Sequence, residues 1–166
     1  MFQVGDRVVY GIHGVCDITD VEQRLVDRKQ VSYLVLEPRN QAGARYLVPT
    51  HNASAMAKLQ KMLSREELEE MLSMDAIRED QWIRDENLRK QTYRELIGSC
   101  DRRKLMAMVH TLYRHKKEQS AAGRKVHLCD DNFLRDAEKL LVSEICVVMD
   151  MEQEQAKRFV RERLSV

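Results

Sequence analysis

The spacing of apolar residues changes from a strand period to a helical period between residues 51 and 64. Before this point, short β-branched or aromatic segments alternate with Gly and Pro. After it, apolar residues recur every three or four positions. The two periods need different cores, because a strand buries alternate residues and a helix buries one stripe. The sequence therefore predicts two packed units, residues 1–60 and residues 61–166.

The first 60 residues predict a small, strongly bent β-sheet. Candidate strands cover residues 2–10, with a Gly5-Asp6 turn inside this segment, and residues 15–21, 31–36 and 45–48. Two of them end close to Pro38 and Pro49, and proline is tolerated there because it cannot donate to a strand ladder. Strands this short and this close together are typical of an SH3-like or Tudor-like β-barrel.

Residues 61–166 predict an all-α domain, so the expected fold class is α+β with a small β-barrel followed by helices. Ser64 and Glu67 form a capping-box pattern that begins a short helix ending near residue 72. Further helices are expected at residues 82–97, 101–119, 131–149 and 152–164. On the helix at 101–119 the stripe opposite the apolar one is polar and mostly basic. Its members are Arg103, His110, Arg114 and Lys117.

The formal net charge of +1 conceals a strongly basic block. Residues 84–125 hold twelve Lys or Arg against five Asp or Glu, whereas residues 126–166 hold six against nine. Such a block attracts a polyanion over a Debye length, roughly 8–10 Å at physiological salt. A single short charge run is commonly a solvated helix face. Twelve basic residues beside the only tryptophan favour nucleic acid.

Motifs for catalysis, cofactors and metals are missing from the sequence, so we expect no enzyme activity, no cofactor and no metal. His13 precedes Cys16 by three residues and His127 precedes Cys129 by two, but neither pair has a second pair at zinc-like spacing. An enzyme with a Cys–His pair stays an alternative, which a single Cys→Ser change would test. Without an apolar leader or a membrane-length apolar run, we expect a cytoplasmic protein with free thiols.

Trp82 lies in the polar segment EDQWIRDEN, at the expected entrance to a helix. It is either a buried anchor for the helix before it or an exposed wedge of the kind that packs against base steps in the minor groove. Basic residues near a wedge would pair with phosphates largely without regard to base sequence. The predicted DNA-binding residues are Trp82, Arg84, Arg89, Lys90, Arg114, Lys117, Arg124 and Lys125.

The β-domain has nearly balanced charge, which makes it a poor DNA-binding candidate. The exposed edges of a small sheet are well suited to pairing with a partner's strand. Arg24 and Arg28 lie at an expected hairpin, where they either meet an acidic partner surface or are simply solvated.

Several segments resemble the CarD/CdnL family. FQVGDRVVYGIHGV at residues 2–15, YLVL at 33–36 and LVP at 47–49 resemble its N-terminal domain, which transcription-repair coupling factors share. In the helical half, Trp82, residues 105–113, AGRK at 122–125 and AEKLLVSE at 137–144 follow in the family's order. The resemblance covers nearly the whole chain.

The resemblance implies a bacterial transcription regulator whose barrel binds the β subunit of RNA polymerase and whose helical domain contacts promoter DNA, stabilising the open complex. The family's wedge tryptophan corresponds to Trp82, a basic residue of its DNA face to Lys125, and the hairpin arginine to Arg24. Some members carry Arg directly before Val-Pro. Here that position is Leu47, and Arg45 is the nearest substitute.

The segment after Trp82 also differs by about one helical turn from some members. We expect a monomer with no membrane partner, associated with the nucleoid through polymerase. The alternative is a KOW-like RNA-binding or ribosome-binding protein, because KOW domains share the G-D-x-V turn. Preferential binding to rRNA would favour it.

Overall fold

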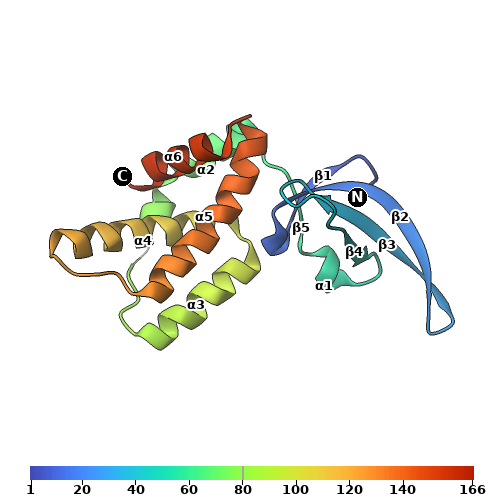
Figure 1. The fold of residues 1–166 in the computed structure, drawn as a ribbon, viewed down its shortest axis with the longest axis horizontal. Helices are drawn as coiled ribbons and strands as arrows, with labels where there is room; N and C mark the ends of the chain where they lie inside the picture. The colour runs from blue at the N-terminus through green and yellow to red at the C-terminus, as the bar shows by residue number, and fades with distance from the viewer. Residues whose placement is uncertain (80) are drawn as a thin grey trace. The chain divides into compact units, whose positions relative to one another are not determined.

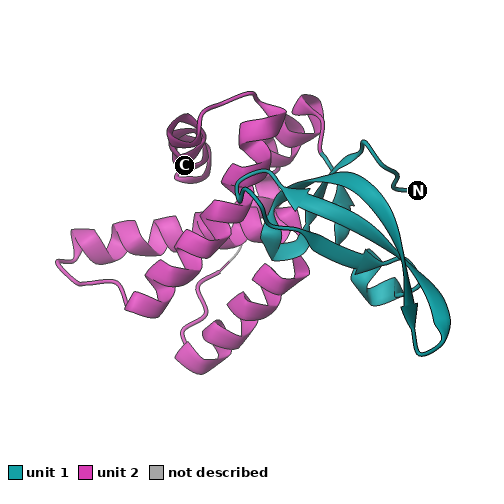
Figure 2. Ribbon diagram, turned by 45° about the vertical axis from the view of Figure 1, so that its right-hand side comes forward, with its two compact units in different colours: residues 1–62 teal, residues 63–166 magenta. Residues whose placement is uncertain are grey.

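The computed structural model describes residues 1–79 and 81–166, and the chain divides into two compact units, residues 1–62 and 63–166 (Figure 2). The first unit is an antiparallel sheet and the second is helical, so the fold class is α+β as predicted (Figure 1). The division lies close to the expected boundary at residue 60. None of the described helices combines the length and apolarity needed to cross a membrane.

The first unit is a five-stranded sheet in the order β4-β3-β2-β1-β5. Its strands are β1 (Arg7–Tyr10), β2 (Val15–Val26), β3 (Lys29–Pro38), β4 (Tyr46–Pro49) and β5 (Leu59–Lys61), with a 3₁₀ turn η1 (Gly11–His13) and a short helix α1 (Ala53–Met56) between strands. The turn expected at Gly5-Asp6 precedes β1. Gly5 has φ of +95°, and its N–H donates to the carbonyl of Ile18 at 2.8 Å, so the chain turns before β1 begins.

A bulge in β2 sets which residues face the core of this unit. Ile18 pairs with Leu36, but the next pair is Asp20 with Val35, so Thr19 is an extra residue. The core on one face of the sheet contains Val8, Cys16, Ile18, Leu34, Leu36, Val48 and Leu59. Before the bulge the residues of β2 on the core side have even numbers, as in Cys16 and Ile18. Beyond it they have odd numbers, because Val21 pairs with Leu34.

The outer part of β2 and β3 forms a β-ribbon, residues 20–33, whose turn end is exposed and extends past the rest of the sheet (Figure 1). Asp27 and Arg28 make its two-residue turn, with φ of +49° and +64°. Positive φ at both positions matches the type I′ turn that suits the twist of a hairpin. Val21 and Leu25 are 43% and 73% exposed on this ribbon.

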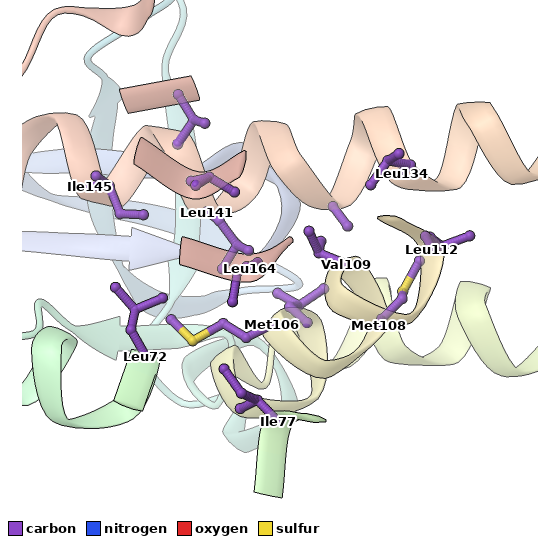
Figure 3. Close-up of a cluster of buried hydrophobic side chains, with 14 of the residues drawn as sticks. Leu72, Ile77, Met106, Met108, Val109, Leu112, Leu134, Leu141, Ile145 and Leu164 are labelled. Carbon is purple, nitrogen blue, oxygen red and sulfur yellow. The ribbon is translucent and has the colours of Figure 1, made fainter. Parts of the chain in front are cut away.

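The second unit packs its helices around α4 and α5 (Figure 3). It contains α2 (Arg65–Ser73), a 3₁₀ turn η2 (Asp75–Arg78), α3 (Glu86–Ser99), α4 (Arg102–Ala121), α5 (Leu128–Val148) and α6 (Gln153–Leu164). The predicted capping box is present, because the Ser64 hydroxyl accepts from the N–H of Glu67 and the Glu67 carboxylate accepts from the N–H of Ser64.

One member of the predicted basic stripe on α4 is not on the surface. His110 is only 6% exposed, and its Nδ1 lies 2.7 Å from the carbonyl oxygen of Leu164 at the end of α6. A ring N–H of histidine can donate to a terminal helix carbonyl inside the core. The prediction of a polar outer stripe was therefore wrong at His110.

Candidate nucleic-acid interface

The candidate interface lies where the segment before α3, the end of α4 and the start of α5 come together at one end of the helical unit (Figures 1 and 2). Two contacts join these segments. Trp82 stacks on His115 of α4, and Arg89 of α3 pairs with Asp130 of α5. This end of the unit carries most of the predicted DNA-binding residues.

Trp82 is half-buried and lies in the extended segment before α3 rather than in a helix. Its ring is parallel to the His115 imidazole, with ring centroids 3.5 Å apart and an interplanar angle of 6°. It also packs against the edge of the helical core. The indole is thus neither the fully enclosed anchor nor the freely projecting wedge that the sequence left open.

Arg89 fixes the position of the segment that carries Trp82. Its Nε and Nη2 donate to the two carboxylate oxygens of Asp130 at 2.8 and 3.1 Å, and its Nη1 donates to the carbonyl of Ile83 at 3.0 Å. The guanidinium carbon lies 4.5 Å from the centroid of the Trp82 ring. One arginine therefore connects α3, α5 and the backbone beside the indole.

The surroundings of Arg89 argue against the predicted contact with DNA. The Arg89 side chain is 3% exposed and that of Asp130 is fully buried. Breaking such a pair to reach a phosphate would leave an uncompensated charge inside the protein, which costs about 3–5 kcal/mol. Arg89 is a positioning residue for the Trp82 segment.

The other predicted cations are accessible. Lys90 is partly exposed and pairs with Glu86 at 2.9 Å, which raises the pKa of its ammonium group. Arg114 is exposed on α4. Four more are exposed and form no ion pair within the part of the chain that the structure describes: Arg84, Lys117, Arg124 and Lys125. Arg124 and Lys125 lie in the loop from α4 to α5, and Lys117 lies in the last turns of α4.

His115 was not predicted, although it lies inside the basic segment. Burial lowers the pKa of its imidazole from 6.5, and the nearby charge of Arg89 lowers it further while Asp130 opposes this. These surroundings favour the neutral form of the ring that stacks on the indole. A histidine among lysines and arginines gives no signal in the sequence that distinguishes a stacking partner from a surface residue.

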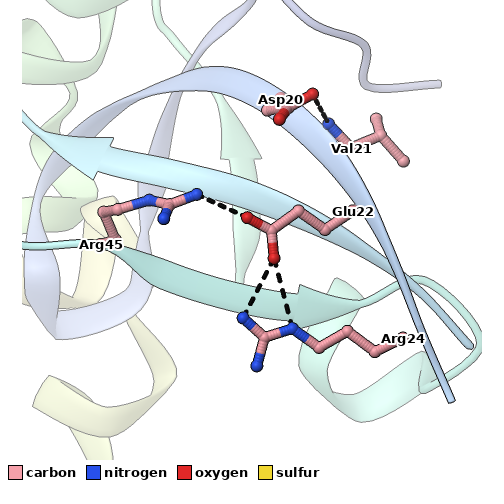
Figure 4. A network of polar contacts seen from close by, with 5 residues as sticks. All are labelled: Asp20, Val21, Glu22, Arg24 and Arg45. Carbon is pink, nitrogen blue, oxygen red and sulfur yellow. Dashed lines mark hydrogen bonds and ion pairs between the residues drawn. The ribbon is translucent and has the colours of Figure 1, made fainter.

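The predicted polymerase-binding residues lie in the first unit, and two of them share one carboxylate (Figure 4). Glu22 accepts from Arg45 Nη2 at 2.7 Å and from Arg24 Nη2 at 3.0 Å. Hydrogen bonds from Arg45 and then from Arg24 lower the pKa of Glu22. Arg28 is exposed in the turn of the ribbon. All three arginines are accessible to a partner.

The Cys16 thiol has the wrong environment for a nucleophile. It is buried in the core on one face of the sheet, its Sγ lies 3.7 Å from the carbonyl oxygen of Gly14, and burial raises its pKa to about 11. A reactive cysteine needs the opposite shift, because the thiolate is the nucleophile. The proximity of His13 and Cys16 in sequence therefore does not make a catalytic pair.

Two protein-family models match the chain. The model described as the CarD-like/TRCF RID domain matches residues 2–62, and the model described as the CarD C-terminal domain matches residues 67–161. The first match coincides with the sheet unit and the second lies within the helical unit.

Proposed function

The chain belongs to the CarD-like family of transcription regulators that interact with RNA polymerase, and from this premise we propose that it stabilises the open promoter complex. In this proposal the first unit binds the β subunit of polymerase, and the second unit contacts promoter DNA with little regard to base sequence. The protein acts as a monomer that associates with the nucleoid through polymerase.

Polymerase binding is assigned to the exposed β-ribbon. Beyond the bulge, the described strand pairings place β3 on one side of β2 and leave its other edge open. An open edge can add a strand from a partner through backbone hydrogen bonds. Arg24 and Arg28 provide charge beside this edge, and Leu25 provides an exposed apolar side chain. An acidic partner surface with an exposed strand would match them.

DNA binding is assigned to the end of the helical unit. Arg84, Lys117, Arg124 and Lys125 are exposed around the same three segments and are available for phosphates. Phosphate contacts position a protein on a duplex without reading sequence. Trp82 is already held in a fixed plane by His115, so the indole needs little ordering before it packs against a base step.

The proposed mechanism is a shift in equilibrium. Polymerase tethers the helical unit near the upstream edge of the bubble, where the effective concentration of DNA is high. The indole then packs against unpaired or distorted bases, and re-annealing must displace it. A stacking contact is worth about 1–3 kcal/mol, which corresponds to roughly a five- to 150-fold change in the ratio of open to closed complexes.

The observation that carries this proposal is the half-buried Trp82 ring, which stacks in parallel on His115. It lies beside four exposed cations that form no ion pair with any described residue. The test is the lifetime of open complexes formed by purified polymerase on a promoter fragment, measured after a competitor is added. The wild-type chain should lengthen this lifetime, and Trp82→Ala should remove most of the increase.

Binding of the same variants to polymerase is the control, because Trp82→Ala should leave it unchanged. Trp82→Phe should keep part of the effect, since phenylalanine can still stack. An equal lifetime with wild type and Trp82→Ala would contradict the wedge. Tighter binding to rRNA than to the polymerase–promoter complex would instead support the KOW-like alternative.

A further inference from the structure

A second basic surface lies on the helical unit, in a groove bounded by α4, α5 and α6. The groove has a volume of about 690 Å³. Its floor is formed partly by the apolar side chains Leu134 and Val142 and by the ring of Tyr113. Five cations line it: Lys116, Arg135, Lys139, Lys157 and Arg161.

The cations form two rows. Arg135 and Lys139 lie four residues apart on α5, and Lys157 and Arg161 lie four residues apart on α6, so each pair shares one helix face. Lys116 of α4 adds a fifth charge. The three helices therefore place five cations around one groove.

The groove keeps a positive charge after its internal pairs are counted. Its carboxylates are Asp131, which pairs with Lys116 at 3.2 Å, and Glu138, which accepts from the Tyr113 hydroxyl and lies 3.9 Å from Arg161 Nε. Arg135 and Lys139 form no ion pair with any residue in the described ranges. These two side chains are therefore available for an anion.

The groove and the candidate interface share two helices. Lys116 follows His115 on α4, and Asp131 follows Asp130 on α5, and consecutive residues of a helix point to different faces. DNA that contacts both sites would therefore span two faces of the α4 and α5 pair. The apolar floor suits the carbons of deoxyribose, and the cationic rows suit phosphate.

We propose that this groove binds the phosphate backbone of the same DNA that Trp82 engages. Arg135 and Lys139 are its principal phosphate contacts, and Lys157 and Arg161 face them from α6. The inference rests on the proposed function, and it extends the DNA footprint along α5. It adds affinity and orientation but no base recognition, because the groove presents charges to a backbone.

The test uses the full chain and a labelled duplex of about three helical turns, with binding measured by fluorescence anisotropy over a range of salt. For each lost phosphate contact the slope of log K against log salt falls by about 0.9. The double variant Arg135→Gln/Lys139→Gln should therefore lower the slope by almost two and weaken binding several-fold. The matched control is Lys104→Gln/Arg158→Gln, which removes two exposed cations outside the groove and should leave the slope near that of wild type.

The fluorescence of Trp82 separates the two proposals. If the groove variant has a reduced slope but keeps the fluorescence change that DNA causes at Trp82, both proposals stand. Equal slopes for the groove variant and wild type would overturn the groove while leaving the Trp82 response intact. A wild-type chain that binds no duplex and gives no Trp82 response would overturn both.

Inorganic pyrophosphate and ATP are tested as competing probes. The backbone proposal expects them to compete only weakly, since they carry few of the charges of a duplex. Tight binding of either probe that Arg135→Gln/Lys139→Gln abolishes, with no change in the DNA slope, would identify a small-phosphate site and overturn the proposal.

Discussion

Arginine–carboxylate pairs occur in both units, and their surroundings differ completely. In the sheet unit, Glu22 joins Arg24 and Arg45, whose side chains are 53% and 50% exposed. In the helical unit, the pair of Arg89 and Asp130 is almost wholly buried. The same chemical groups therefore do different work. The first cluster leaves charged groups at the surface, and the second fixes the backbone beside Trp82.

The difference lies in what happens when one partner is lost. An exposed arginine without its carboxylate is hydrated by water, so an exposed ion pair adds little to stability. A buried arginine without its carboxylate keeps its charge inside the protein, which is strongly destabilising. Loss of one partner should therefore lower the stability of the protein far more at the Arg89–Asp130 pair of the helical unit than at the Glu22 cluster of the sheet unit.

The largest effect is expected for Asp130→Ala. Loss of the carboxylate leaves the buried Arg89 guanidinium without a counter-charge. This should lower the free energy of unfolding by about 3–5 kcal/mol. Urea denaturation followed by circular dichroism measures it. The double variant Arg89→Met/Asp130→Leu should recover most of the loss, because no buried charge remains. A loss below about 1 kcal/mol for Asp130→Ala would show that the pair is not buried in solution.

A smaller effect is expected for His115→Ala, which removes the stacking partner of the indole. Aromatic stacking contributes about 0.5–1.5 kcal/mol beyond burial. The emission maximum of Trp82, the only tryptophan, should shift to longer wavelength as its ring becomes more solvated. His115→Phe should restore the wild-type emission. No shift in the Ala variant would mean that the stack is absent in solution.

His115 also predicts a pH dependence of stability. The pKa of His115 is about 6.5 in the unfolded chain and lower in the folded protein. At a pH between the folded-state and unfolded-state pKa, the unfolded chain therefore binds more protons than the folded one. The stabilisation from neutral His115 is thus complete above about pH 6.5 and is lost as the pH falls toward the folded-state pKa. Comparing wild type with His115→Phe by thermal melts from pH 5 to pH 8 isolates this contribution, which the phenylalanine variant should lack.

In the sheet unit, Arg28→Gly should be slightly stabilising. Arg28 has φ of +64°, which costs a residue with a side chain roughly 1 kcal/mol and costs glycine little. The greater freedom of glycine in the unfolded chain offsets part of this, so a net gain of about 0.5 kcal/mol is expected. If Arg28 contacts polymerase, the same variant should bind it more weakly. Arg28→Asn, which also tolerates this conformation, is the matched variant.

The smallest effect on stability is expected for Glu22→Gln, because both of its arginines are exposed and the Glu22 side chain itself is 25% exposed. Its thermal midpoint should equal that of wild type. Association with polymerase should become faster if the partner surface is acidic, since Arg24 and Arg45 lose their internal counter-charge. A large drop in the midpoint would mean that this pair resembles the buried one after all.

Much of the helical unit could be predicted from the sequence, because local signals determine where helices begin and which stripe is apolar. Ser64 and Glu67 marked the start of α2, and the expected bounds of α6 differ from the observed ones by one residue at its start. In the sheet unit, β5 and α1 were not predicted. They are three and four residues long, too short to show a period.

The environment of the candidate site was much harder to predict. Arg89 looks like any exposed arginine until Asp130, which is 41 residues away in the sequence, is brought against it by packing. The stack of Trp82 on His115 likewise joins a segment before α3 to the last turns of α4. Long-range partners decide whether a charge is buried, and no local pattern reports them.

The extra residue at Thr19 determines which chemistry each side of the β-ribbon presents. Paired residues share a side of a sheet, so Val21 and Leu25 stand with Leu34, while Glu22 and Arg24 stand with Val35. Because Thr19 is left out of the ladder, Asp20 can pair with Val35 and Val21 with Leu34. If Thr19 itself stood opposite Val35, every later residue of β2 would move to the other side of the sheet, and Glu22 and Arg24 would stand with Leu34. The bulge therefore decides which side of the ribbon carries the ionic groups, although it lies outside the ribbon.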